Sequence, residues 1–164
     1  MTSLQTGPRD LLHDVLREVL GNVPRIDRTC PDCAEQHGKP VLDHPDLHVS
    51  SSHAAGLAVV AVTDVGPVGV DVEKADAAGF PGFDGVALAP GETGDAARIW
   101  TRKEAVLKAT GEGLRTDPRT VVVTGEREPV RGAALYDVPV PEGWCASLAV
   151  VTPGRPDLQV SPGR

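Results

Sequence analysis

The sequence predicts an α+β fold in which two small, related lobes share a core. The first half of the 164-residue chain holds an amphipathic helical pattern followed by an apolar strand pattern. The second half holds a strand, a second helical pattern and several further strand candidates. A chain of this length is sufficient for one domain or for two small lobes. We expect the lobes to be residues 1–66 and 67–164, the second carrying the metal and catalytic motifs.

Composition and charge exclude several classes of function. The net charge is −7, so no overall positive field would attract nucleic acid or an anionic membrane. No apolar run reaches membrane-spanning length, and the N-terminus lacks the pattern of a signal peptide. Three cysteines without a secretion signal argue against a disulfide framework. We therefore expect a cytoplasmic protein that binds neither nucleic acid nor membrane.

The first half of the chain begins with its clearest amphipathic helix, predicted over residues 6–20. Leucines and valines at helical spacing form the apolar face, Pro8 lies in the first turn, and Gly21 ends the helix. Residues 22–47 are rich in proline and glycine, which predicts a loop. The continuous apolar run at residues 57–62 then predicts a buried strand.

The second half alternates strand and helix signals. Residues 68–73 alternate valine with glycine or acidic residues, which predicts a strand antiparallel to the one before it. Residues 74–94 are expected to be weakly structured. A helix is expected from about residue 93 or 95 to about residue 109, where glycines stop it. The remaining strand candidates are residues 120–124, 132–137 and 145–151.

The strand at residues 68–73 carries the first motif that indicates chemistry. Because side chains alternate along a strand, Asp71 and Glu73 project from one face beside Gly69. The glycine would leave room for a ligand next to the two carboxylates. An Asp-x-Glu pair at a strand end is also common on ordinary solvated surfaces, and that interpretation stays open.

The helix that follows carries the second motif. Trp100, Glu104 and Lys108 are spaced by four residues, so they lie on one helix face. Taken alone, Glu104 and Lys108 would be a surface ion pair. If this face packs over the acidic strand, three carboxylates converge with Lys108 and Lys103. Such a set suits a hard divalent cation that holds a phosphorylated ligand.

These motifs resemble those of the 4′-phosphopantetheinyl transferases, in particular the long, single-chain, surfactin-synthetase-activating class. The similarity extends from about Arg9 to about Val151, in a variant shorter than is usual for the class. It rests on four stretches in order: His37-Gly38-Lys39-Pro40; Ser50-Ser51-Ser52-His53 with Gly56; Gly69-Val70-Asp71-Val72-Glu73; and Trp100-Thr101-Arg102-Lys103-Glu104 with Lys108 and Gly111. The family fold implied by this resemblance has two similar α+β lobes in a pseudo-twofold arrangement.

The resemblance also implies an activity. Members of this family transfer the phosphopantetheine arm of coenzyme A to a serine of an acyl- or peptidyl-carrier protein, with Mg²⁺, and release adenosine 3′,5′-bisphosphate. By this resemblance Asp71, Glu73 and Glu104 would hold Mg²⁺ together with the coenzyme A pyrophosphate. Glu104 would also be the general base for the serine, and Lys108 would contact the pyrophosphate and the leaving bisphosphate. The class implies a place in secondary-metabolite biosynthesis.

The other matched positions imply further contacts to coenzyme A. Lys103, next to Glu104, would contact phosphate as well. Ser52 and His53 would hold the 3′-phosphate, although His53 could instead be a polar residue at the entrance of the apolar strand. Lys39 and Pro40 would lie beside the adenine.

The chain departs from the family pattern in two places. It starts about one helical segment later than most members of the class, a segment that contributes basic residues to the 3′-phosphate site. The interval from Glu73 to Trp100, which helps to receive the carrier protein in this family, is also short. A non-catalytic homologue that binds coenzyme A or a carrier protein therefore remains an alternative.

Cys30 and Cys33 supply a third interpretation. With His37, His44 and His48 nearby, the Cys-x-x-Cys pair is typical of a tetrahedral zinc site, which would make the chain a zinc-dependent interaction module. Only His44 and His48 have the short spacing usual for a second ligand pair, so two reduced cysteines in a loop are the simpler expectation. Zinc chelation would unfold such a module, whereas magnesium chelation would stop the enzyme and leave its fold intact.

Overall fold

The computed structural model describes residues 8–124 and 129–162 and has the mixed α+β fold predicted from the sequence. The predicted helix positions 6 and 7 lie outside the described residues. In chain order the elements are α1 (Pro8–Leu20), β1 (Ile26–Asp27), β2 (Val41–Leu42), β3 (His48–Ala54), β4 (Leu57–Thr63), β5 (Val68–Lys74), α2 (Phe83–Ala87), α3 (Ala96–Thr110), the 3₁₀ turns η1 (Gly113–Arg115) and η2 (Pro118–Thr120), β6 (Ala133–Asp137) and β7 (Trp144–Val151).

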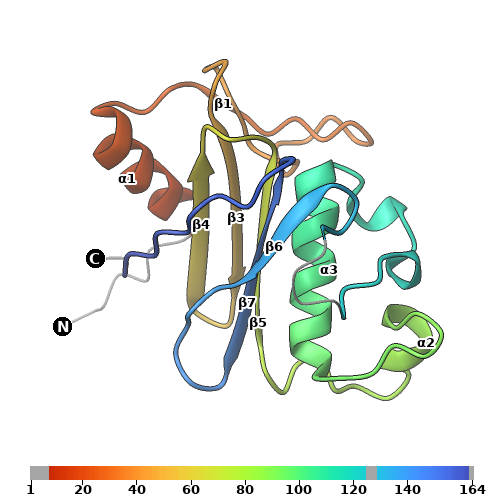
Figure 1. Cartoon of the computed structure of the whole chain (residues 1–164). Coiled ribbons are helices and arrows are strands. Elements are labelled where there is room, and N and C mark those ends of the chain that lie inside the picture. Colours follow the sequence, from red (N-terminus) through yellow and green to blue (C-terminus); the bar gives the residue numbers. More distant parts are fainter. Residues whose placement is uncertain (1–7, 125–128, 163–164) are drawn as a thin grey trace.

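Two groups of antiparallel strands lie between the two long helices. The hairpin β3–β4 is covered by α1, and the three-stranded sheet β5–β7–β6 is covered by α3 on the other side of the molecule (Figure 1). The short strands β1 and β2 pair with each other. Among the described residues, no helix has the length and apolar character needed to cross a bilayer.

The strand pairing corrects the neighbour expected for β5. β5 pairs with β7, from Val68 opposite Val150 to Lys74 opposite Trp144, and not with the preceding strand β4. β4 instead pairs with β3, a strand that the polar residues 48–54 concealed in the sequence. The two-residue turn between them has positive φ at both Ala55 and Gly56, the backbone that closes a tight hairpin.

Three apolar clusters hold the layers together. Leu12 and Leu16 of α1 are fully buried against Val49 of β3. The side chains that join the hairpin to the three-stranded sheet are Ala61, Val68, Val70, Leu148 and Val150. The largest cluster lies under α3 and includes Val106 and Leu107. Because the hairpin and the sheet share a core, β3 lies beside the edge strand β5, next to the acidic motif.

Two other predictions for secondary structure are wrong. Residues 120–124 form no ladder: the Val123 N–H donates to Glu92 Oε1, and its carbonyl accepts from Arg102, so side chains replace a partner strand. The segment 74–94, expected to be weakly structured, contains the short helix α2, which is anchored by the buried Phe83. The boundaries of α3, β6 and β7 agree with the prediction to within a few residues.

Gly69 has a different role from the one expected. A Cβ atom there would lie 2.1 Å from the Ala105 carbonyl oxygen, 2.5 Å from the Ala109 nitrogen and 2.8 Å from Lys108 Cβ. The missing side chain therefore leaves room for the backbone of α3 and not for a ligand. This close approach brings Lys108 directly over β5.

We expect Gly69→Ala to destabilise the fold by about 3 kcal/mol, because the new methyl group would collide with backbone and force α3 outward. Urea unfolding followed by circular dichroism measures this change. Gly85→Ala is the matched control, because a Cβ at that helical glycine meets nothing within 4 Å. The control should be neutral or stabilising by up to about 1 kcal/mol. Equal stability of the two variants would contradict the close packing at Gly69.

Candidate active site

The candidate site lies where α3 crosses β5. The Lys108 ammonium forms an ion pair with Asp71, with 2.6 Å between Nζ and Oδ1, and is 3.3 Å from the carbonyl oxygen of Val70. Asp71 is buried, and its Oδ1 also accepts a 2.8 Å hydrogen bond from Ser52 Oγ. The structure thus brings Asp71, Lys108 and Ser52 together from three different elements.

Two carboxylate oxygens in this site are buried without a hydrogen-bond partner among the described residues. They are Asp71 Oδ2 and Glu104 Oε1. Leaving a buried acceptor unsatisfied costs about 1–3 kcal/mol, so the arrangement is unfavourable unless a ligand completes it. An all-oxygen donor set of this kind suits Mg²⁺ or a similar hard cation. The side chains present therefore fit a divalent metal ion.

The charge of Asp71 influences the ionisation of the two glutamates near it. Burial is the main cause of a raised pKa at Glu73, and the charge of Asp71 raises it further. Burial also raises the pKa of Glu104. Lys108 opposes that rise, while the neighbouring Asp71 and Glu73 add to it. The charge of Asp71 therefore raises the pKa of both glutamates, an effect that a bound cation would oppose.

The three carboxylates do not form a compact group of ligand atoms in the described structure. Among the described residues, the group whose ligand atoms all lie within 4.8 Å of one another is Cys30, Cys33 and His37, and not the three carboxylates. The positive charge next to Asp71 is the Lys108 ammonium. Holding a metal would require Glu73 and Glu104 to converge by side-chain rotation.

An apolar cavity of about 260 Å³ opens beside Glu73. Its wall includes Trp100, whose ring packs edge-to-face on Phe83 with 6.1 Å between ring centroids. The other lining residues are Ala77, Ala78 and Phe80. Trp100 therefore has a packing role, and the half-exposed side chain of Phe80 lies at the edge of the site.

The structure places Lys103 in the core and not beside Asp71 and Lys108. This side chain is fully buried, its ammonium forms an ion pair with Glu92 at 2.5 Å, and it donates to the Pro118 carbonyl oxygen. Successive residues on a helix are turned by about 100°, so Lys103 cannot share the face of Glu104. Lys103 is a structural residue.

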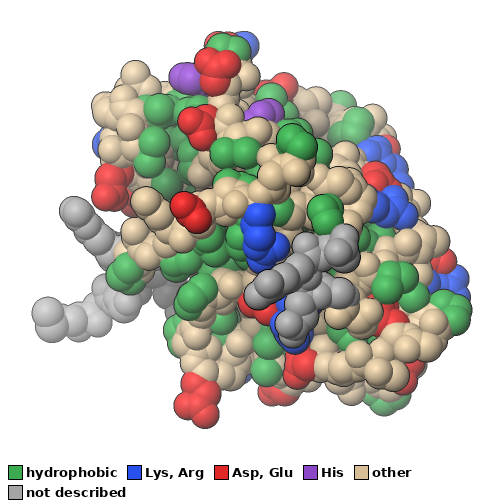
Figure 2. Space-filling view, in the orientation of Figure 1, with side chains coloured by type: hydrophobic (Ala, Val, Ile, Leu, Met, Phe, Trp, Pro, Cys, Tyr) green, Lys and Arg blue, Asp and Glu red, His purple; other side chains and the backbone are tan. Residues whose placement is uncertain are grey.

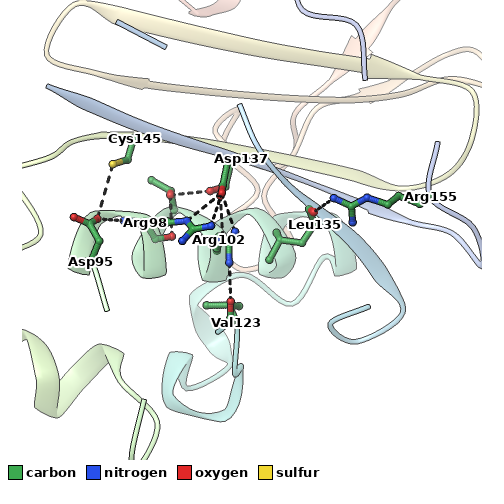
Figure 3. A network of polar contacts seen from close by, with 10 residues as sticks. Asp95, Arg98, Arg102, Val123, Leu135, Asp137, Cys145 and Arg155 are labelled. Carbon is green, nitrogen blue, oxygen red and sulfur yellow. Dashed lines mark hydrogen bonds and ion pairs between the residues drawn. The ribbon is translucent and has the colours of Figure 1, made fainter. Parts of the chain in front are cut away.

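Arg102 is a second structural residue within the same motif. It is buried and donates to both carboxylate oxygens of Asp137, each at 2.8 Å, and to the Val123 carbonyl oxygen (Figure 3). Arg98 binds the same Asp137 carboxylate. This network fixes α3 to β6, so one side of the motif holds the helix in place and the other faces the site.

Lys39 and Pro40 lie close to the end of α3. The Lys39 ammonium donates to the carbonyl oxygens of Lys108, at 2.7 Å, and Ala109, at 3.2 Å, while Pro40 is buried. The loop that carries them therefore contacts the backbone of Lys108, a residue of the candidate site. Sequence reasoning gave no sign of this contact with the helix terminus.

The structure separates Ser52 from His53. The Ser52 and Ser50 hydroxyls face β5, where Ser50 Oγ accepts a hydrogen bond from the Val70 N–H. Because side chains alternate along β3, His53 leaves the strand on the other face and is exposed. His53 is therefore available to a ligand, whereas Ser52 is engaged at Asp71 and Lys108.

Charged side chains of both signs are spread over the face shown in Figure 2, among apolar ones. The expectation that the chain binds neither nucleic acid nor membrane stays a prediction.

The family model of the 4′-phosphopantetheinyl transferase superfamily matches residues 67–152. Because this match covers just over half of the chain, the protein belongs to that superfamily. No curated protein sequence matches the chain. The matched segment runs from the start of β5 to the end of β7 and so contains Asp71, Glu73, Glu104 and Lys108.

Proposed function

We propose that the protein transfers the 4′-phosphopantetheine arm of coenzyme A to a serine of an acyl- or peptidyl-carrier protein and releases adenosine 3′,5′-bisphosphate. Superfamily membership supports phosphopantetheinyl transfer in general. The observation that carries the finer proposal is a pair of buried oxygens, Asp71 Oδ2 and Glu104 Oε1, that have no hydrogen-bond partner in the described part of the chain and lie near the Lys108 ammonium. These oxygens favour a cation-dependent site for a diphosphate.

In this proposal Asp71, Glu73 and Glu104 hold Mg²⁺. When bound, the ion neutralises the pyrophosphate of coenzyme A and favours departure of the bisphosphate. Glu104 takes the proton of the acceptor serine, which is a poor nucleophile until a base lies within hydrogen-bond reach. Lys108 provides a fixed positive charge for the leaving phosphate, at little cost in reorganisation.

The remaining contacts of coenzyme A follow the same arrangement. We place the 3′-phosphate near the exposed His53 and the adenine near Lys39 and Pro40. Ser52 supports Asp71 and Lys108 through its hydroxyl and lies between these two regions. The adenine end would then lie near the C-terminal end of α3, and the reacting phosphate at its middle.

We further propose that the chain is a short variant of the long, surfactin-synthetase-activating class. Its lobes would be residues 1–66 and 67–164, in a pseudo-twofold arrangement with a helix against antiparallel strands in each. The cytoplasm is its proposed location, since it supplies coenzyme A and keeps thiols reduced. The carriers would belong to secondary-metabolite pathways.

Intact-mass spectrometry of several apo-carrier proteins, incubated with the protein, Mg²⁺ and coenzyme A, tests the proposed function. We expect at least one carrier to gain the mass of one phosphopantetheine group. Unchanged masses across a broad panel, with an active transferase as positive control, would contradict it. Binding of coenzyme A without any mass change would instead support the non-catalytic alternative.

We place the carrier protein against the apolar cavity beside Glu73, whose edge exposes Phe80. Phe80→Ala should raise the KM for the carrier about tenfold, the effect of removing 1–2 kcal/mol of apolar contact, and leave the KM for coenzyme A unchanged. Steady-state kinetics with each substrate varied in turn measures this. Val19→Ala, on the exposed side of α1, is the control for loss of surface apolar area. Equal increases in the KM for the carrier and in the KM for coenzyme A would contradict the placement of the carrier at this cavity.

A further inference from the structure

The loop between β1 and β2 gathers three side chains that bind metals of the zinc class. The two thiol sulfurs of Cys30 and Cys33 and one ring nitrogen of His37 all lie within 4.8 Å of one another. Cys33 Sγ is 2.9 Å from His37 Nε2. Neither His44 nor His48 belongs to this group. The sequence suggested the cysteine pair, but not which histidine the fold would bring to it.

The backbone on both sides of Cys30 is held by hydrogen bonds. The Cys30 N–H donates to the Glu35 carbonyl oxygen at 2.8 Å. The Ala34 N–H closes the turn by donating to the Cys30 carbonyl oxygen at 2.9 Å. Ala34 itself has a φ of 62°, a left-handed conformation that an alanine adopts only at some cost in free energy.

These features occur together without a function in the proposed transfer reaction. The hydrogen-bonded turn at Cys30, with its left-handed Ala34, brings the ligand atoms of Cys33 and His37 within 4.8 Å of the Cys30 sulfur. Neither thiol forms a disulfide. A single cysteine near one histidine could arise by chance. Two sulfur donors and an imidazole held within 4.8 Å by a hydrogen-bonded turn are not explained in that way.

We propose that Cys30 Sγ, Cys33 Sγ and His37 Nε2 bind one Zn²⁺ ion, with water in the fourth, solvent-facing position. Two sulfurs and one imidazole nitrogen are a donor set that selects zinc over magnesium. Zn–S bonds near 2.3 Å and Zn–N bonds near 2.0 Å place sulfur and nitrogen roughly 3.6 Å apart. The exposed Cys33 and His37 side chains reach this spacing by small rotations. Each thiol gives up its proton as it binds the ion.

The proposed zinc site lies directly before the residues that we place at coenzyme A. Gly38 donates to the Arg28 carbonyl oxygen at 2.7 Å, and Lys39 reaches the carbonyl oxygens at the end of α3. The ion would tie the chain at Cys30 and Cys33 to the chain at His37, immediately before this contact. Zinc would therefore hold the Lys39 loop in place while Mg²⁺ binds separately at β5. The zinc site itself does not depend on the proposed function.

Thiol protection on the unmodified protein tests the zinc site without any variant. The reduced, metal-free protein is treated with iodoacetamide with and without one equivalent of Zn²⁺, and each cysteine is quantified by peptide mass spectrometry. We expect Zn²⁺ to slow alkylation of Cys30 and Cys33 at least tenfold and to leave Cys145 unchanged, since Cys145 lies outside the group. Equal rates with and without Zn²⁺ at Cys30 and Cys33 would overturn the proposal.

Replacing zinc by Co²⁺ identifies the donor atoms. The Co²⁺ protein should show thiolate-to-metal charge transfer in the near ultraviolet and the intense visible bands of a four-coordinate ion. Cys33→Ser and His37→Ala should each weaken Co²⁺ binding at least tenfold, while Cys145→Ser should bind as the unmodified protein does. Binding that survives both substitutions, or a spectrum without thiolate bands, would overturn the assignment. None of these readouts depends on transferase activity, so failure of the two proposals can be distinguished.

Discussion

Glu104→Gln is expected to abolish phosphopantetheinyl transfer and, at the same time, to make the metal-free protein more stable. Glutamine neither accepts the serine proton nor provides an anionic metal ligand, so we expect the rate to fall by about 10³-fold. The same change removes the negative charge of a half-buried side chain that lies near Asp71 and Glu73. Relief of the cost of burying that charge and of the repulsion should raise Tm by about 3 °C, from about 1 kcal/mol.

The pH dependence of stability provides an independent check on the same residue. The pKa of Glu104 is raised in the folded protein, so the folded state holds its proton more firmly than the unfolded chain does. Without metal, stability should therefore fall as the pH rises from the unfolded pKa, near 4.3, through the raised folded value, and should level off above it. Glu104→Gln should flatten this fall. Thermal unfolding between pH 4 and pH 8 with EDTA measures it.

Two controls separate the roles of the acidic residues. Glu73→Gln removes a metal ligand but not the proposed base, so it should retain more activity than Glu104→Gln. Glu142→Gln, at an exposed glutamate between β6 and β7, should change neither rate nor Tm. Similar residual rates for the Glu73 and Glu104 variants would show that Glu104 has no second role as a base.

Lys108→Ala is expected to lower kcat by about 100-fold while weakening coenzyme A binding much less. The ammonium is held at 2.6 Å from Asp71 and close to the proposed pyrophosphate, so its charge should matter most as the leaving group departs. Single-turnover rates and a direct coenzyme A titration measure the two effects. An equal loss in the single-turnover rate and in the affinity for coenzyme A would show that Lys108 binds the ground state as strongly as the transition state.

The same substitution should also destabilise the metal-free protein, because it leaves the buried Asp71 carboxylate without its cation. Lys108 is partly exposed, so we expect a loss of about 2 kcal/mol, below the value for a fully buried pair. Millimolar Mg²⁺ should restore part of this stability by binding the freed carboxylate. Lys74→Ala, at the end of β5, is the matched control; among the described contacts, the side chain of this exposed lysine meets only the Trp144 ring, with 5.9 Å from Nζ to the ring centroid, so its loss should cost less than about 1 kcal/mol and should not respond to Mg²⁺. Destabilisation that Mg²⁺ leaves unchanged would count against a metal site at Asp71.

The acidic strand and the helix over it could be predicted because local rules determine them. Asp95 caps α3 by accepting from the Arg98 N–H, and Gly111 ends the helix with a φ of 77°. Between these signals the i, i+4 spacing fixes which residues share a face, and the structure places Glu104 and Lys108 over β5 as that spacing implies. Alternation along β5 similarly placed Asp71 and Glu73 toward the helix.

What the sequence concealed depends on contacts between distant segments. Residues 48–54 look like a polar loop, yet their serine hydroxyls bind the backbone and side chains of β5. The position of Lys103 beside Glu104 in the sequence suggests a phosphate ligand. In the structure its ammonium instead forms a buried ion pair with Glu92, on another face of α3. His37 joins Cys30 and Cys33 only through the turn at Ala34. Neither periodicity nor motif spacing reports such partners.

The most direct test of the account is the position of Mn²⁺ in a crystal of the protein with coenzyme A, located by its anomalous scattering. We predict one strong peak in contact with Asp71, Glu73 and Glu104 and with the pyrophosphate oxygens, and with the Lys108 ammonium beside the same diphosphate. Coenzyme A bound elsewhere, or bound here with no manganese between it and the three carboxylates, would contradict the central claim.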